Sequence, residues 1–244
     1  MKISVLINGA FGKMGMITAQ AISEDENFEL VGQTGRGYDL AAAIIDSKAQ
    51  VVIDLTNAES VYQNSKIIIE AGVHPVIGTS GLVAEQISQL EKICEQRQLG
   101  GIIAPNFSIG ALLMNRFAVE AVKYLPQVEI IEYHHDKKLD SPSGTAIRSA
   151  AILAAARGDY SKMSAHKEIV AGARGANYQE IPIHAVRLPG LLAHQDIIFG
   201  AEGETLTLRH DSIDRKCFMP GIKLACKKVI ALKTLVYGLE QLLV

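Results

Sequence analysis

The sequence predicts an α/β protein with a doubly wound parallel sheet, an inserted α+β unit and a last helix that returns to the sheet. The first observation is that short β-branched runs alternate with longer helical patterns over residues 3–104, as in parallel sheets with helices on both faces. The second is that this alternation stops near residue 105, and three strand-like runs then follow one another between residues 181 and 210. Short connections favour antiparallel pairing, so we expect these three strands to pair with one another.

The first part of the chain alternates regularly between strand and helix. Strands are expected at residues 3–7, 28–33, 51–54, 75–78 and 101–104, and helices at residues 13–23, 39–46, 58–71 and 83–98. The helix at 83–98 is amphipathic, because Ile87, Leu90 and Cys94 fall on one face. Residues 1–106 therefore carry the parallel sheet.

The second part has a different order of elements. Helices are expected at residues 108–124 and 143–157, strands at 128–135, 181–187, 194–199 and 204–210, a long excursion at 158–179, and an apolar helix at 222–243. The change of pattern divides the chain into two domains, one of residues 1–106 with 216–244 and the other of residues 107–215.

Composition limits the classes of protein to consider. Hydrophobic residues make up 48% of the 244 residues, which is ample for a core, and the formal net charge is −2. No global basic field attracts nucleic acid or an anionic membrane, so we expect neither as a partner. No apolar run approaches the length of a membrane span. The cysteines, Cys94, Cys217 and Cys226, are odd in number and form no CxxC pair, which favours reduced thiols and a cytoplasmic location.

A glycine-rich loop joins the first strand to the first helix. Gly9, Gly12 and Gly15 give the spacing GxxGxxG, with Ala10 where the usual motif has a glycine. Glycines let the backbone approach a pyrophosphate, and the helix N-terminus supplies free N–H groups. The loop predicts a Rossmann-type dinucleotide site, and the alternative is an ordinary tight turn between strand and helix. The residues expected to hold the pyrophosphate are Gly9, Ala10, Phe11, Gly12, Lys13 and Met14.

The end of the second strand bears on the choice of cofactor. An acid that binds the ribose hydroxyls is expected about 20 residues after the glycine loop, but Gly35 and Arg36 stand there and Asp39 comes slightly too late. Arg36 is able to hold a 2′-phosphate, which favours NADPH over NADH. The alternative for Arg36 is a solvated loop charge.

The densest group of reactive side chains lies at residues 132–146. His134, His135, Lys137 and Lys138 place four cations within five residues. Adjacent histidines at a strand end point to opposite sides, so one suits proton transfer and the other a substrate contact. No further well-spaced ligands accompany them, and we expect no metal site. The alternative is a solvated surface loop.

Three other loops add to this picture. The turn at 142–145 enters a helix, so its N–H groups and hydroxyls form an anion site suited to a carboxylated substrate. The loops at 78–81 and 104–108 follow the fourth and fifth strands, at the carboxyl ends where ligands bind in open α/β sheets.

Taken together, these segments resemble the dihydrodipicolinate reductase family. The resemblance covers nearly the whole chain, and its most specific part is the signature HHxxKxDxPSGTA, which begins at His134 and ends at Ala146. It also includes Asp54-Leu55-Thr56, the GExLxLxH run that ends at His210, and the RxxFxxG run that begins at Arg215.

The resemblance implies a reaction and a cellular role. The family reduces 4-hydroxy-tetrahydrodipicolinate (dihydrodipicolinate), a small cyclic dicarboxylate, to tetrahydrodipicolinate in the diaminopimelate route to lysine. A hydride passes from NADPH or NADH to the ring, and a proton follows. By this resemblance residues 1–106 and 216–244 bind the dinucleotide. Residues 107–215 bind the substrate and form a homotetramer, and the last helix packs back on the first domain.

The resemblance also implies roles for single residues. His134 matches the catalytic acid/base and Lys138 the proton donor. The substrate contacts would be His135, Ser143, Gly144 and Thr145. Besides the glycine loop and Arg36, the cofactor contacts would be Gly78, Thr79, Ser80, Ala104, Pro105, Asn106, Phe107 and Arg215.

The chain departs from the family pattern at a few positions. Gly35 stands where an acid is frequent, Ser80 replaces a second threonine, and the run from Arg187 to Gly190 lacks its usual glycine-rich form. None of these departures removes a catalytic group.

Two other functions are compatible with a two-domain plan of this kind. One is an NAD(P)-dependent oxidoreductase acting on an amino acid or a semialdehyde. The semialdehyde version needs a nucleophilic cysteine near the nicotinamide, and no cysteine lies in the predicted site loops. The other is a catalytically silent nucleotide-binding sensor, which would be expected to lack His134 or Lys138.

Overall fold

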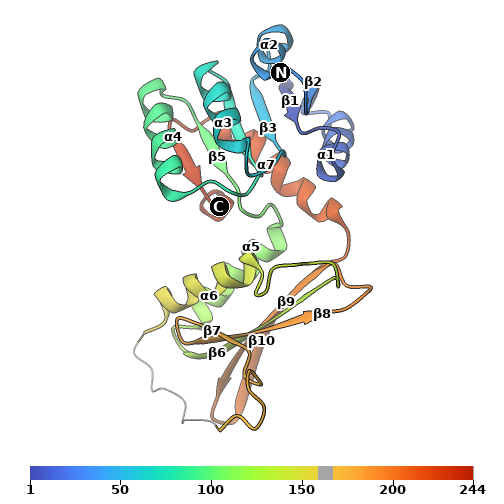
Figure 1. The fold of residues 1–244 in the computed structure, drawn as a ribbon. Helices are drawn as coiled ribbons and strands as arrows, with labels where there is room; N and C mark the ends of the chain where they lie inside the picture. The colour runs from blue at the N-terminus through green and yellow to red at the C-terminus, as the bar shows by residue number, and fades with distance from the viewer. Residues whose placement is uncertain (159–166, 244) are drawn as a thin grey trace. The chain divides into compact units, whose positions relative to one another are not determined.

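The computed structural model describes residues 1–158 and 167–243, which form two compact units (Figure 1). Unit 1 consists of Met1–Ile109 and Arg215–Val244, and unit 2 of Gly110–Asp214. Each unit has its own hydrophobic core. No helix in the described part of the chain is long and apolar enough to cross a membrane.

Unit 1 is built on a six-stranded parallel sheet. Its strands are β1 (Ile3–Asn8), β2 (Phe28–Thr34), β3 (Val51–Asp54), β4 (His74–Ile77), β5 (Gly101–Ile103) and β11 (Leu235–Tyr237), in the order β11-β5-β4-β3-β1-β2. The order reverses between β1 and β3, so the predicted doubly wound sheet is confirmed. Ligands of such sheets bind outside the carboxyl ends of the strands at this reversal.

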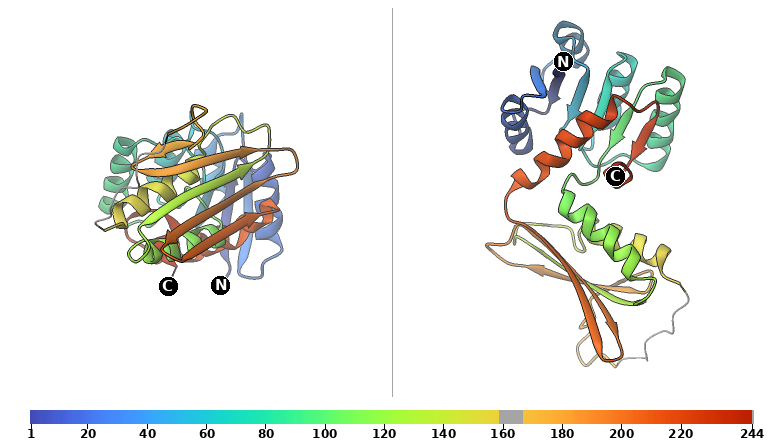
Figure 2. Two further views of the ribbon diagram at one scale, coloured as in Figure 1. Left: turned by 90° about the horizontal axis from the view of Figure 1, so that it is seen from below. Right: turned by 180° about the vertical axis from the view of Figure 1, so that it is seen from behind.

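Helices cover both faces of this sheet. They are α1 (Lys13–Ser23), α2 (Leu40–Ser47), α3 (Val61–Glu70), α4 (Ala84–Arg97) and α7 (Met219–Val229). Helices α2, α3 and α4 pack against one face, and α1 and α7 lie side by side on the other (Figures 1 and 2). The central strands are buried on both sides, since the consecutive residues Val51 and Val52, which point to opposite faces, have no exposed surface. Strands that are apolar on both faces are typical of parallel sheets.

The end of the chain differs from the prediction. Instead of one helix over residues 222–243, helix α7 ends at Val229, strand β11 follows, and a short 3-10 helix, η2 (Leu239–Leu242), closes the described chain. Strand β11 pairs in parallel with β5, with Val236 opposite Ile102. Without it, β5 would be an edge strand with unpaired backbone groups. Gly238, at a φ of +95°, then turns the backbone out of the strand.

Unit 2 contains a mixed five-stranded sheet with two helices on one face. The strands are β6 (Gln127–His134), β7 (Ala176–Tyr178), β8 (Ile181–Arg187), β9 (Ala193–Ala201) and β10 (Glu204–Ser212), in the order β10-β9-β6-β8-β7. Helix α5 (Ile109–Ala121) begins where the first segment of unit 1 ends, and α6 is Gly144–Ala156. Both helices pack on the core of this sheet. The predicted α+β unit is therefore confirmed.

The pairing within this sheet corrects one expectation and adds a strand. Strands β9 and β10 pair antiparallel as expected, but β8 pairs with β6 in parallel and not with β9. The linker at 188–192 is long enough for this, because five extended residues span about 16 Å and two strand spacings only about 10 Å. Of the predicted excursion at 158–179, residues 159–166 lie outside the described residues, and the rest contains β7.

Candidate active site

The glycine loop of unit 1 is packed so closely that larger residues would clash. Gly9 directly follows β1 and has a φ of +86°, and a Cβ there would lie 2.4 Å from the carbonyl oxygen of Leu55. A Cβ on Gly15, in the first turn of α1, would lie 2.1 Å from the carbonyl oxygen of Gly9. The loop thus brings β1 and the N-terminus of α1 into close contact, as a pyrophosphate-binding turn requires.

The residues around this loop fit a dinucleotide. Gly12 is the N-cap of α1 and has no side-chain cap, so the first N–H groups of the helix remain available to an anion. A Cβ on Gly12 would meet only the carbonyl oxygen of Gly9, at 3.5 Å. The exposed rings of Phe11 and Tyr38 lie 5.6 Å apart, and they supply an aromatic surface beside the loop.

The missing acid at position 35 has a structural explanation. A Cβ on Gly35 would lie 2.8 Å from the ring of Phe11, so an acidic side chain would require this ring to move. Arg36 follows directly and is exposed. The structure thus leaves Arg36 as the charged residue at the tip of β2.

A buried carboxylate ties together the loops at the carboxyl ends of the strands. Asp54, at the end of β3, has no exposed surface. Its Oδ1 accepts hydrogen bonds from the hydroxyls of Thr56 (2.7 Å) and Thr79 (2.6 Å), and its Oδ2 accepts from the amides of Asn8 and Asn64, both at 2.9 Å. One side chain therefore fixes the ends of β1, β3 and β4. The Thr79 hydroxyl is turned toward Asp54.

The two loops that follow β4 and β5 meet at an aromatic ring. A Cβ on Gly78 would lie 2.6 Å from the ring of Phe107, and Phe107 is buried. The side chain of Asn106 accepts a hydrogen bond from the N–H of Ser108 at 2.8 Å, which shapes the second loop. Ser80 and Pro105 are exposed and Ala104 is buried. The structure thus brings these predicted cofactor residues together within unit 1.

Arg215 is the predicted cofactor residue with the least structural support. It begins the 3-10 helix η1 (Arg215–Phe218) and is partly exposed. Its side chain makes no hydrogen bond or ion pair within residues 1–158 and 167–243, so a role in closing on a cofactor stays a prediction.

In unit 2 a buried glutamate anchors His134. Glu132 and His134 lie two residues apart on β6 and so share a face, and the Glu132 side chain has no exposed surface. Its Oε2 contacts Nδ1 of His134. Its two oxygens accept hydrogen bonds from Nη1 (3.0 Å) and Nη2 (2.7 Å) of Arg187, and Oε1 also accepts from the N–H of Ser143 at 3.2 Å. Arg187 lies directly opposite His134 in the pairing of β6 with β8.

The electrostatics of this cluster keep Glu132 ionised. Burial alone raises the pKa of the Glu132 carboxyl, but the hydrogen bonds from His134 and Arg187 outweigh it and bring the pKa below its usual value. The side chain of His134 is 14% exposed. Because Nδ1 of His134 contacts Glu132, Nε2 is the ring nitrogen that can contact a substrate.

The basic loop after β6 is attached to the same arginine. Lys138 donates to both carboxylate oxygens of Asp140, at 2.7 and 2.9 Å, and Arg187 donates to the carbonyl oxygen of Asp140 at 2.9 Å. The hydrogen bond from Lys138 lowers the pKa of Asp140. The Nδ1 of His135 is buried without a hydrogen-bond partner among the described residues.

The N-terminus of α6 forms the rest of the predicted substrate site. Ser143 is the N-cap, and its hydroxyl accepts a hydrogen bond from the N–H of Ala146 at 3.2 Å. A Cβ on Gly144 would meet nothing within 4 Å, and Thr145 is partly exposed. The N–H groups of Gly144 and Thr145 remain for an anion. Ser143 contributes through the cap, because its own N–H is bound to Glu132.

Several residues of the site were given no role in the sequence prediction. Glu132, Arg187, Asp140 and Asp54 hold the predicted side chains in place. One signal was available for Glu132, since a charged residue shares its strand face with the apolar Val128 and Ile130. Arg187 gave no such signal, because its partners in this cluster, Asp140 and Glu132, lie 47 and 55 positions away in the chain.

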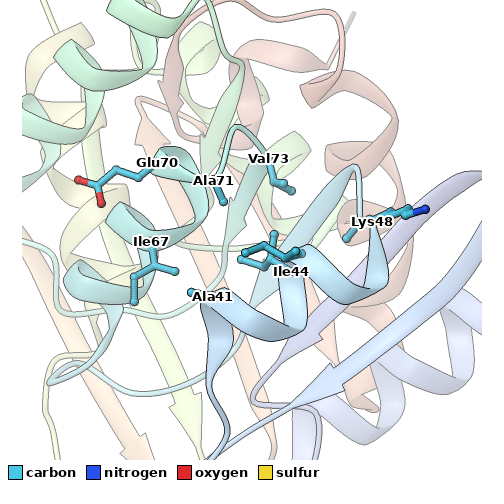
Figure 3. Close-up of a pocket in the computed structure, with 9 residues that line it drawn as sticks. Ala41, Ile44, Lys48, Ile67, Glu70, Ala71 and Val73 are labelled. Carbon is cyan, nitrogen blue, oxygen red and sulfur yellow. The ribbon is translucent and has the colours of Figure 1, made fainter.

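A separate groove lies between α2 and α3 of unit 1. It encloses about 630 Å³ and is lined by apolar residues that include Ile44 and Ile67, with Lys48 and Glu70 at its rim (Figure 3). None of the predicted site residues lines it, so it is not part of the candidate active site.

Comparisons with known proteins agree with this geometry. The family model "Dihydrodipicolinate reductase, N-terminus" matches residues 3–107, and "Dihydrodipicolinate reductase, C-terminus" matches residues 110–243. The 4-hydroxy-tetrahydrodipicolinate reductases of Legionella pneumophila (strain Paris) and Coxiella burnetii (strain RSA 493 / Nine Mile phase I) are 54% and 53% identical over 243 residues, covering 100% of both chains in each case. The solved structure of a dipicolinate-bound dihydrodipicolinate reductase from Paenisporosarcina sp. TG-14 aligns with a TM-score of 0.91 at 43% identity, covering 100% of both chains.

Proposed function

The chain belongs to the dihydrodipicolinate reductase family, and from this premise we propose that it reduces 4-hydroxy-tetrahydrodipicolinate to tetrahydrodipicolinate. It is an oxidoreductase that uses a nicotinamide dinucleotide. The observation that carries the proposal is the segment from Glu132 to Thr145. It places an anchored imidazole and a lysine in one loop that leads into an open helix N-terminus. This suits the recognition and protonation of a small dicarboxylate in the diaminopimelate route to lysine.

In this proposal unit 1 binds the cofactor and unit 2 binds the substrate. In unit 1, Gly9 to Met14 would hold the pyrophosphate, and the loops of Gly78, Thr79, Ser80 and of Ala104 to Phe107 would line the nicotinamide site. NADPH or NADH, when bound, supplies the hydride. In unit 2, the N–H groups of Gly144 and Thr145 would bind one carboxylate of the substrate, and His135 would make a further contact.

The proton that follows the hydride is assigned to the basic loop. His134 would act as the acid/base through Nε2, because its Nδ1 is directed at Glu132. Lys138 would donate the proton, and its pairing with Asp140 holds the ammonium in place until the substrate binds. An imidazole suits the acid/base role proposed for His134, since the ordinary pKa of imidazole lies near neutrality.

A spectrophotometric assay tests the proposal. Purified protein is mixed with NADPH and freshly generated product of the preceding synthase, and the loss of reduced cofactor is followed. Rapid oxidation that depends on this substrate is expected. Oxidation with amino acids or semialdehydes instead would favour an oxidoreductase of different specificity. Cofactor binding without turnover on any of these compounds would favour a silent sensor.

NADPH is the proposed preferred cofactor. Arg36 is the exposed cation at the tip of β2, and no acid stands at position 35 to bind the ribose hydroxyls of NADH. Charge-assisted hydrogen bonds contribute about 1.5–3 kcal/mol. Arg36→Ala is therefore expected to raise the dissociation constant of NADPH about tenfold or more and to leave that of NADH nearly unchanged.

Fluorescence titrations with both cofactors measure this difference. Arg97→Ala, which removes another arginine of unit 1 at the end of α4, is the control and should change neither constant. Equal losses of NADPH and NADH affinity in Arg36→Ala would contradict the proposed contact between Arg36 and the 2′-phosphate of NADPH.

We also infer a homotetramer formed through unit 2, as the resemblance implies. Ile169 and Val170 of this unit are 93% and 69% exposed, and exposed neighbouring apolar residues are typical of interfaces. Light scattering of the purified chain should give the mass of four copies, and Val170→Asp should shift the mass toward smaller species.

The cytoplasm is our proposed location, since all three cysteines keep their thiols.

A further inference from the structure

We propose that Glu132 and Arg187 are positioning residues for His134, with Glu132 holding the ring as the Nδ1–H tautomer so that Nε2 faces the substrate. The catalytic use of this arrangement rests on the proposed function, but the arrangement itself does not.

The first argument is burial. Glu132 is fully buried on the side of β6 that packs against α5 and α6, where Val128 and Ile130 are apolar. A carboxylate in such a place is costly unless hydrogen bonds compensate it. Here the imidazole, both terminal nitrogens of one guanidinium and one backbone N–H contact its two oxygens. These donors all belong to the site, and together they compensate the burial of the Glu132 carboxylate.

The second argument is the direction of the hydrogen bond to His134. An ionised carboxylate only accepts hydrogen bonds, and the contacts with His134 and Arg187 hold the pKa of Glu132 below its usual value in spite of its burial. The nitrogen of His134 that faces Glu132 must therefore carry a proton. In the neutral imidazole this leaves Nε2 as the acceptor, and in the imidazolium it leaves the Nε2 proton free to be donated.

The third argument is the double attachment of Arg187. Its guanidinium binds Glu132 through two nitrogens and also donates to the carbonyl oxygen of Asp140, whose carboxylate holds Lys138. A planar fork fixes such a carboxylate in orientation as well as in position. Arg187 therefore orients the two proposed proton-transfer residues through two separate contacts.

The test uses the full chain and Glu132→Gln, which keeps the shape and removes the charge. Arg187 requires an acceptor, so the amide oxygen of the new glutamine should turn toward Arg187 and its NH₂ group toward His134. The imidazole must then accept at Nδ1, which inverts the tautomer. Long-range ¹H–¹⁵N spectra of the imidazole rings report the tautomer directly. The signals of His134, among seven histidines, are assigned by their loss in His134→Gln.

A matched control lies on the same strand. Glu129 also accepts from a histidine, His184 at 2.8 Å, and from an arginine, Arg174, but its position in the alternation of β6 puts it on the opposite face. Glu129→Gln should change neither the tautomer of His134 nor the turnover number. Arg187→Lys, which keeps a cation but loses the fork, serves as a second variant if Glu132→Gln fails to fold. It should retain Nδ1–H and lower turnover about tenfold.

The expected result is Nδ1–H in the wild type and Nε2–H in Glu132→Gln, with turnover about 10- to 100-fold lower and an unchanged dissociation constant for NADPH. Nε2–H in the wild-type protein would overturn the proposal whatever the activity. So would an unchanged tautomer in Glu132→Gln with turnover equal to that of Glu129→Gln. The expected tautomers in a protein that fails the reductase assay would support the positioning pair and contradict the proposed function.

Discussion

Replacing His134 with glutamine is expected to lower the turnover number about 100- to 10,000-fold, the range that general acid–base catalysis contributes. Glutamine has nearly the size of histidine and can still accept a hydrogen bond, but it cannot take up and release a proton near neutral pH. The residues proposed to bind the cofactor lie in unit 1, whereas His134 lies in unit 2. The dissociation constant of NADPH should therefore stay within about twofold of the wild-type value.

Steady-state kinetics and a fluorescence titration measure the two quantities. His184→Gln is the matched control, because His184 is also a histidine of unit 2 paired with a glutamate of β6 but has no proposed role in catalysis. It should retain wild-type turnover. Wild-type turnover in His134→Gln would contradict the assignment of His134 as the acid/base.

The fold of unit 1 was accessible from the sequence because its signals are local. Strands β1 and β3 are mostly apolar and largely buried, and each is followed by a helix of clear periodicity. Strand β11 was missed for the opposite reason. Residues 235–237 are a short apolar run within residues 222–243, which were expected to form one helix. What makes them a strand is the open edge of β5, which is distant in the sequence.

The same distinction explains which parts of the site were predicted. His134, Lys138 and the turn into α6 lie in one continuous segment, so their spacing in the sequence was enough to predict them as site residues. Arg187 could not be found in this way, because the expected pairing of β8 with β9 would have placed it beside the wrong strand. The observed pairing puts β6 between β8 and β9, and only then does Arg187 meet Glu132. The sequence prediction missed the anchor of His134 because it missed the pairing of β6 with β8.

Gly15→Ala is expected to destabilise the protein by about 1–3 kcal/mol, as overpacking of a tight site does. The new methyl group would lie 2.1 Å from the carbonyl oxygen of Gly9 and 2.6 Å from Cα of Ala10. Both are backbone atoms, so no side-chain rotation relieves the clash and the glycine loop itself must open. Thermal unfolding without cofactor should show a lower midpoint. An unchanged midpoint would contradict the close packing of β1 against α1.

Gly12→Ala in the same loop separates folding from binding. Its methyl group would meet only the carbonyl oxygen of Gly9, at 3.5 Å, so the midpoint without cofactor should match the wild type. At the N-cap of α1, however, the methyl group takes space that a pyrophosphate needs. A tenfold weaker affinity removes about 1.4 kcal/mol of the stabilisation that saturating NADPH gives. If NADPH raised the midpoint of Gly12→Ala as much as that of the wild type, the pyrophosphate would have to lie elsewhere, and the tight loop would be a structural turn only.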